Sequence, residues 1–129
     1  MLANYKYVSV RTAAILTGSY VAGTVIGLDG ALISNQNQLI VYADFTIGSL
    51  TDCQIKVEFS PDNSTYYQET FSAISGGTST ESLGVHKLAA TGKYRIAIPI
   101  KDKFVKISAI GTGTVTSSSL AINAVVGEV

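Results

Sequence analysis

The sequence predicts an all-β domain, a sandwich or barrel of about eight to ten short strands. Apolar and polar side chains alternate along most of the chain, as in strands with one buried face. Turn residues interrupt these runs at short intervals, and no segment has the apolar spacing of a helix of ordinary length. The 129 residues are 47% hydrophobic and 14% charged. This composition excludes a disordered chain, and the length suits one domain, residues 1–129.

The amino-terminal third contains short runs of β-branched and aromatic residues. They cover residues 5–10, 13–17 and 20–28, and Gly18 and Gly23 interrupt them. We expect strands that are less regular here than in the rest of the chain.

The clearest strand covers residues 53–60, where Cys53 and three further apolar residues alternate with polar ones. Residues 38–47 show a similar pattern. Pro61 presets the backbone for a turn after the first of these strands, and residues 66–72 then return as a strand. Residues 53–72 are therefore predicted to form a β-hairpin.

The second half of the chain continues this pattern. Residues 75–80 are predicted to be a polar loop, and residues 81–90 a strand or an irregular segment, because Gly84 disfavours a helix. Pro99 cannot donate to a sheet ladder, so it marks an edge, a bulge or the end of a strand. The further strands are predicted at residues 93–100, 104–110 and 120–126.

Charge and hydropathy exclude several classes of partner. Nine basic residues balance nine acidic ones, and no run of Lys or Arg occurs. We therefore expect no nucleic acid as a partner, since phosphate binding requires a basic surface. No stretch approaches the length of a membrane span, so we expect no membrane partner. The amino terminus does not resemble a signal peptide, which predicts a protein made in a reducing cytoplasm.

The residue types of catalysis and metal binding are sparse. His86 is the one histidine and has no motif partner, while Cys53 lies on an apolar strand face where packing is expected. The aspartates are scattered and mostly lie at turns. We therefore expect no enzyme, no catalytic residue, no cofactor and no metal ion. A glycosidase or a metal-dependent hydrolase stays open as an alternative, because two carboxylates could still meet in space.

Several segments resemble small bacteriophage and prophage virion proteins. Such proteins often have a strand, a Ser-Pro-Asp-Gly-type turn and a second strand that opens on two aromatic residues. Here the turn contains Asn63 where glycine is common, and the aromatic pair is Tyr66 and Tyr67. The resemblance extends over residues 19–26, 37–45, 55–63 and 92–99.

This resemblance implies an antiparallel, jelly-roll-like β-sandwich that serves as a capsid decoration (cement) protein. Such a protein is made in the host cytoplasm, binds the major capsid protein on the capsid exterior and is often a homotrimer. Residues 1–18 would then be a docking arm. The interface residues expected from this reading are Tyr5, Tyr7, Arg11 and Tyr66.

The alternative function is that of a carbohydrate-binding sandwich on a virion or cell surface. The chain has seven tyrosines, and tyrosine offers a flat apolar ring with a polar tip. Exposed Tyr, Asn and Asp side chains in residues 60–65 and 75–80 would then contact surface glycans.

Overall fold

The computed structural model describes residues 6–28, 37–68, 70–75 and 77–128. These residues form strands connected by turns and loops, without a helix among them. The strands are β1 (Lys6–Ala14), β2 (Val21–Ala22), β3 (Ile26–Gly27), β4 (Asn37–Thr46), β5 (Leu50–Ser60), β6 (Tyr67–Gln68), β7 (Thr70–Ser75), β8 (Thr78–Leu83), β9 (Val85–Leu88), β10 (Gly92–Pro99), β11 (Phe104–Gly113) and β12 (Ser119–Glu128).

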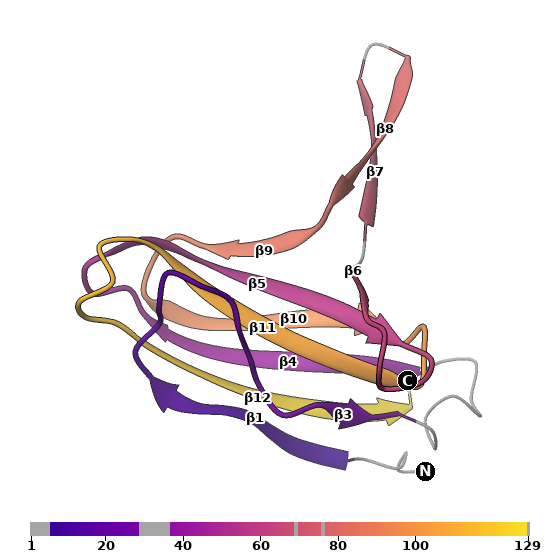
Figure 1. The fold of residues 1–129 in the computed structure, drawn as a ribbon, viewed down its shortest axis with the longest axis horizontal. Helices are drawn as coiled ribbons and strands as arrows, with labels where there is room; N and C mark the ends of the chain where they lie inside the picture. Colours follow the sequence, from indigo (N-terminus) through magenta and orange to yellow (C-terminus); the bar gives the residue numbers. More distant parts are fainter. Residues whose placement is uncertain (1–5, 29–36, 69, 76, 129) are drawn as a thin grey trace.

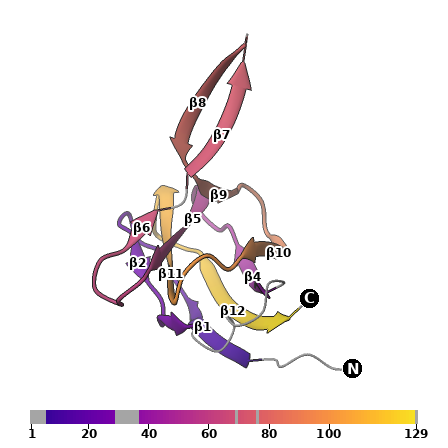
Figure 2. The same ribbon diagram turned by 90° about the vertical axis from the view of Figure 1, so that its right-hand side faces the viewer.

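Two antiparallel sheets form a sandwich (Figure 2). Sheet A has the order β1-β12-β4-β10. Sheet B has the order β2-β11-β5-β6, with β3 also paired to β11 and β9 also paired to β5. If β2 with β3 and β6 with β9 are each taken as one position, each sheet has four positions. Along the chain, consecutive positions change sheet at every step except from β5 to β6, as in a jelly roll. The structure confirms the predicted antiparallel, jelly-roll-like sandwich.

The core lies between the sheets and contains the inward side chains of the long strands. The alternation predicted for β5 is confirmed, because Cys53, Ile55, Val57 and Phe59 are all buried. Each fully buried aliphatic or aromatic side chain of this kind contributes about 1.5–3 kcal/mol. The other long strands supply Leu39, Val41, Ala43, Phe45, Val105, Ile107, Ala109, Leu120, Ile122, Ala124 and Val126.

The amino-terminal segment is less regular than the rest of the chain, as the sequence predicts, but it contains one long strand. Lys6–Ala14 is one strand, β1, which pairs with β12 and shifts register twice, between Ser9 and Arg11 and between Arg11 and Ala14. Pairing with the carboxy-terminal strand is a long-range contact, which local sequence patterns do not reveal. Whether residues 1–18 also act as a docking arm stays a prediction, and residues 1–5 lie outside the described part.

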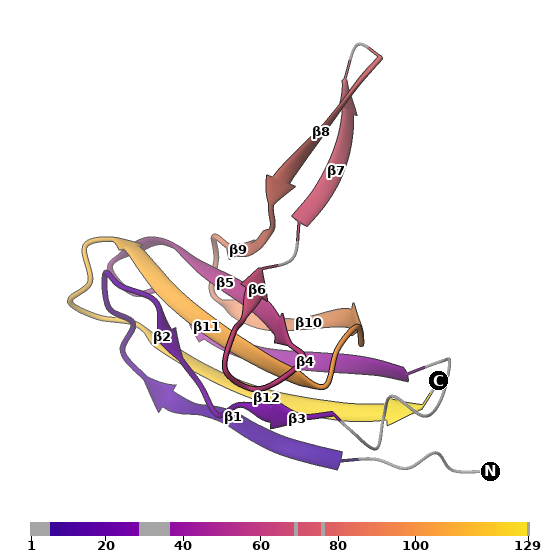
Figure 3. The same cartoon turned by 45° about the vertical axis from the view of Figure 1, so that its right-hand side comes forward.

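The predicted return strand at residues 66–72 is split in the structure. Only Tyr67–Gln68 pairs with β5, opposite Glu58 and Phe59. β9 pairs with the other half of the same β5 edge, from Cys53 to Lys56. Between them, β7 and β8 form a separate hairpin that projects away from the sandwich (Figures 1 and 3). The segment predicted as a polar loop, residues 75–80, thus includes the start of β8.

Two connections between the sheets meet at one end of the sandwich. The turn from β4 to β5 contacts the loop from β11 to β12. The Ser49 hydroxyl donates to the main-chain oxygen of Thr114 (2.7 Å) and accepts from the N–H of Ser117 (2.9 Å). The N–H of Ser49 also donates to the main-chain oxygen of Ser117 (2.9 Å). Beside this contact, Gly48 adopts a positive φ of 55°.

We predict that Gly48→Ala destabilises the fold by about 2 kcal/mol or more, because an alanine is strained at this φ. Its Cβ would also collide with the main-chain oxygen of Ser117. Urea unfolding measures the change. Gly18→Ala is the matched control, since a Cβ there meets no atom within 4 Å. A stability of Gly48→Ala equal to that of the control would contradict the prediction.

Candidate interaction surfaces

The outer face of sheet A carries a row of three polar side chains. Tyr42 on β4 lies directly opposite Asn123 on β12 and Arg95 on β10. Tyr42 is 41% exposed. The structure gives the Tyr42 hydroxyl, the Asn123 amide and the Arg95 guanidinium no hydrogen bond or ion pair within the described residues. Three groups with unused hydrogen-bonding capacity therefore lie side by side on one face.

The next row of the same face holds an ion pair. The Lys93 ammonium lies 3.0 Å from a carboxylate oxygen of Asp44, its direct cross-strand partner. Both side chains are well exposed, so the pair contributes little stability. Together the two rows border a shallow hollow of about 310 Å³, here called the sheet A hollow. Its lining residues are Tyr42, Ala43, Asp44, Lys93, Tyr94, Arg95 and Asn123.

The Tyr94 side chain packs against the core, and its hydroxyl is already engaged. It donates to the main-chain oxygen of Ala90 at 2.6 Å. The groups left to meet a ligand are therefore a phenol, an amide and a guanidinium, with a Lys–Asp pair beside them. This set can bind hydroxyl groups and anions. It contains no nucleophile that is activated by a neighbouring base.

On the outer face of sheet B, aromatic rings cover two of the lysines. The Lys56 ammonium lies 4.3 Å from the centre of the Tyr20 ring, and that of Lys106 lies 4.0 Å from the centre of the Tyr66 ring. Lys56 also lies 3.7 Å from a carboxylate oxygen of Glu58. Because these charges have partners on the same face, sheet B offers less unused binding capacity than sheet A.

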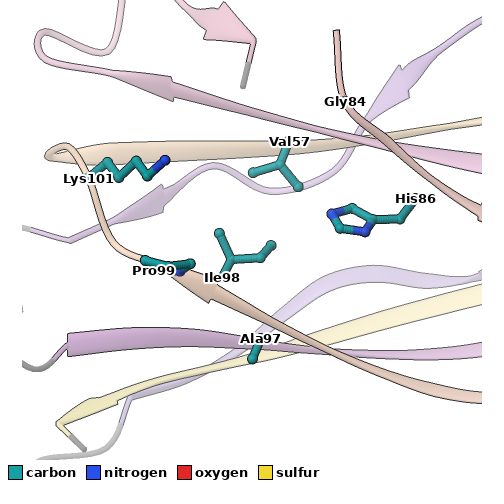
Figure 4. A pocket seen from close by; sticks show the side chains of 7 residues that line it. All are labelled: Val57, Gly84, His86, Ala97, Ile98, Pro99 and Lys101. Carbon is teal, nitrogen blue, oxygen red and sulfur yellow. The ribbon is translucent and has the colours of Figure 1, made fainter. Parts of the chain in front are cut away.

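An apolar groove opens between the two sheets, where β9 and β10 form their neighbouring edges. Figure 4 shows His86 and Lys101 on either side of Val57 and Ile98. The groove measures about 240 Å³, and Gly84, Ala97 and Pro99 complete its lining. Burial lowers the pKa of His86 from its ordinary value of 6.5. The imidazole is therefore neutral at physiological pH.

Cys53 is inaccessible on the inner face of β5, with no exposed surface. Burial is the main cause that raises the pKa of its thiol to about 11. The thiolate, the form that attacks disulfides and electrophiles, is consequently scarce near neutral pH.

The aspartates do not assemble a site in the described part of the chain. Asp44 pairs with Lys93, Asp52 accepts from the Thr112 hydroxyl, and Asp62 accepts from the backbone of its own turn. Asp29 lies outside the described residues. Within residues 6–28, 37–68, 70–75 and 77–128, no group of three His, Cys, Asp or Glu side chains could hold a metal ion. The same residues include no helix long and apolar enough to span a membrane.

The predicted interface residues do not form one surface. Tyr7, 67% exposed, and Arg11 both lie on β1 of sheet A. Arg11 donates to the main-chain oxygens of Leu120 and Ile15, both at 3.0 Å, so it supports the local backbone. Tyr66 lies on the face of sheet B, where its hydroxyl donates to the Asn63 side chain. Tyr5 lies outside the described residues, and an interface role for the four stays a prediction.

The residues of the sheet A hollow were missed as a site in the sequence. The pattern places Arg95 on the outward face of its strand, but it does not indicate which side chains of other strands lie beside it. Arg95 and Asn123 are 28 positions apart in sequence, yet both flank Tyr42. The strand order, which brings them together, is set by long-range pairing.

Comparisons with known proteins support the fold. No protein-family model and no curated protein matches the chain. Among solved structures, the fold is similar to that of a chain described in the words "Bacillus endospore appendages form a novel family of disulfide-linked pili". The TM-score is 0.50, the identity is 9%, and the match covers 98% of this chain and 90% of that chain.

This similarity overturns the resemblance to phage virion proteins. Nearly the whole chain matches the fold of a pilus protein, so the capsid decoration function, the major capsid protein as partner, the trimer and the location on the capsid exterior are wrong. The error has a physical cause. The segments that carried the resemblance are strands and turns, and an antiparallel sandwich needs such patterns whatever its function.

We predict that Cys53 resists alkylation in the folded protein at about pH 8, because the thiol is both buried and protonated. Mass spectrometry after iodoacetamide treatment measures this. The same sample in guanidinium is the control and should be alkylated fully. Rapid stoichiometric alkylation without denaturant would contradict the buried position.

We predict that stability falls as the pH drops from about 7.5 to about 5.5. The lowered pKa of His86 means that the unfolded chain binds more protons than the folded chain below pH 6.5. Urea unfolding at several pH values in this window measures the free energy of unfolding. In His86→Gln this free energy should change less steeply with pH than in the wild type. Asp62→Asn is the control, because hydrogen bonds from Thr65 and Ser64 lower the pKa of Asp62 below 3.8, outside the window. If the free energy of unfolding of His86→Gln depends on pH as steeply as that of the wild type, His86 is not the cause of the pH dependence.

Proposed function

We propose that this chain is a non-catalytic structural subunit that associates with copies of itself into a filament on a cell or spore surface. The observation that carries the proposal is the fold similarity to a protein described as forming pili, over nearly the full length of both chains. The surfaces described above are the outer faces of two sheets and a groove at their edges. Such surfaces suit contact with neighbouring subunits better than catalysis.

The projecting hairpin is the element that we assign to contact between subunits. Within the described residues, β7 pairs with β8, and neither is hydrogen-bonded into sheet A or sheet B. A lone two-stranded hairpin is only marginally stable in water. Docking on a neighbouring copy would supply the missing contacts, so the hairpin is suited to connect one subunit to the next.

The contacts between subunits are non-covalent in this proposal. The similar pili are described as disulfide-linked. The present chain has one cysteine, Cys53, and it is buried in the core. A disulfide at Cys53 would require the sandwich to open, so hydrogen bonds and side-chain packing have to hold the copies together.

We predict that replacing residues 69–83 by a Gly-Ser link abolishes filament formation but leaves the sandwich folded. The insertion can be removed because its two ends are close: the Gln68 side chain donates to the main-chain oxygen of Gly84 at 3.2 Å. Electron microscopy and sedimentation across a concentration series measure assembly. Circular dichroism and the melting temperature test whether the variant has kept its fold.

Two outcomes test self-association and the role of the hairpin separately. A wild-type protein that remains monomeric at every concentration would contradict the filament. Filaments formed equally by the shortened variant would support self-association and contradict the role of the hairpin.

A further inference from the structure

We propose that the sheet A hollow binds a saccharide that carries a carboxylate group, such as a uronic acid or a sialic acid. The site consists of Tyr42, Arg95 and Asn123, with the Asp44–Lys93 pair at its side. This proposal goes beyond the proposed function as a filament subunit, because it assigns a ligand to the outer face of sheet A. It does not depend on self-association, since all five residues belong to one chain.

The position of the three polar groups is fixed by the sheet. Direct pairing places Asn123, Tyr42 and Arg95 in one row across three adjacent strands. Neighbouring strands lie about 4.8 Å apart, so the row spans about 10 Å. Tyr42 lies on β4, which has a hydrogen-bonded neighbour on both sides, and its backbone is therefore held in place. A ligand would meet a row of groups that is already arranged for binding.

The charge of the hollow favours an anion. Asp44 is already paired with Lys93 at 3.0 Å. Arg95 is exposed and has no acidic partner within the described residues. Lys93 and Arg95 are positive and Asp44 is negative, so the hollow has one uncompensated positive charge, on the guanidinium of Arg95. A guanidinium can donate two parallel hydrogen bonds to one carboxylate.

The remaining groups favour a saccharide over an acidic peptide. The Asn123 amide can donate and accept, and the Tyr42 hydroxyl can do both, which suits the hydroxyl groups of a sugar. Tyr42 is 41% exposed, and its ring offers a flat apolar surface against which a sugar ring can pack. The hollow is shallow and has no deep apolar pocket that would hold a peptide side chain.

The loops that the sequence offered for glycan binding are less suitable. In residues 60–65, the Asp62 carboxylate accepts from the N–H of Ser64 and of Thr65, both at 2.9 Å. Asn63 accepts from the Tyr66 hydroxyl. These side chains are used to hold the turn, whereas those of the sheet A hollow have capacity left. The second loop, residues 75–80, lies partly outside the described residues.

The test is calorimetric titration of the full chain with three acidic probes: tetragalacturonic acid, a hyaluronan tetrasaccharide and sialyllactose. Neutral galactotetraose and a glutamate tetrapeptide serve as comparison ligands. We expect at least one acidic saccharide to bind with a Kd of about 1 mM or lower. Arg95→Gln should weaken this binding about tenfold, because a charge-assisted hydrogen bond is lost. Lys103→Gln, which removes an exposed cation outside the hollow, should change it less than twofold.

A second variant separates recognition of the sugar from recognition of charge. Tyr42→Ala should also weaken binding of the acidic saccharide, because the packing surface for the sugar ring is lost. Absence of binding by all three acidic probes up to about 10 mM would overturn the proposal. Equal binding of the glutamate peptide, or unchanged binding by Arg95→Gln, would also overturn it. Melting temperatures of the variants verify that each is folded.

Discussion

The fold depends on one constraint, which is that the alternate side chains of each long strand fill the space between the two sheets. A strand displaced by one residue would turn its apolar side chains outward and its polar ones into the core. The burial of Phe45, Ile55, Ile107 and Ile122 therefore fixes the register of the four long central strands. The same register determines the outer rows. Tyr42 lies beside Arg95 and Asn123 because the inner rows cannot move.

The sequence allows prediction of those parts of the fold that depend on local patterns. Buried residues of β5 alternate with less buried ones from Cys53 to Phe59, and Pro99 falls at the end of β10. The projecting hairpin was not predictable, because residues 66–72 have the composition of one continuous return strand. The local pattern does not indicate where pairing with β5 stops and pairing with β8 begins. The sheet A hollow was missed for a related reason, since its residues come from three strands whose order depends on long-range contacts.

Function was the least accessible property. The lone His86 and the buried Cys53 could be assigned to structural positions from their neighbours alone, but an absence of chemistry does not identify a partner. The segments that resembled phage proteins carry information about a sandwich and not about its partners. The surfaces of this molecule differ in a way that only the structure reveals: Lys56 and Lys106 on sheet B are covered by tyrosine rings, whereas Arg95 on sheet A is uncovered.

The split edge of sheet B has a practical consequence. β6 and β9 each complete part of the edge of β5, and within the described residues the hairpin inserted between them is not hydrogen-bonded into either sheet. Insertions at this position can therefore vary in length and sequence while the core is unchanged. The molecule is suited to serve as a display scaffold, in which a foreign peptide takes the place of the hairpin and is carried on a rigid β support.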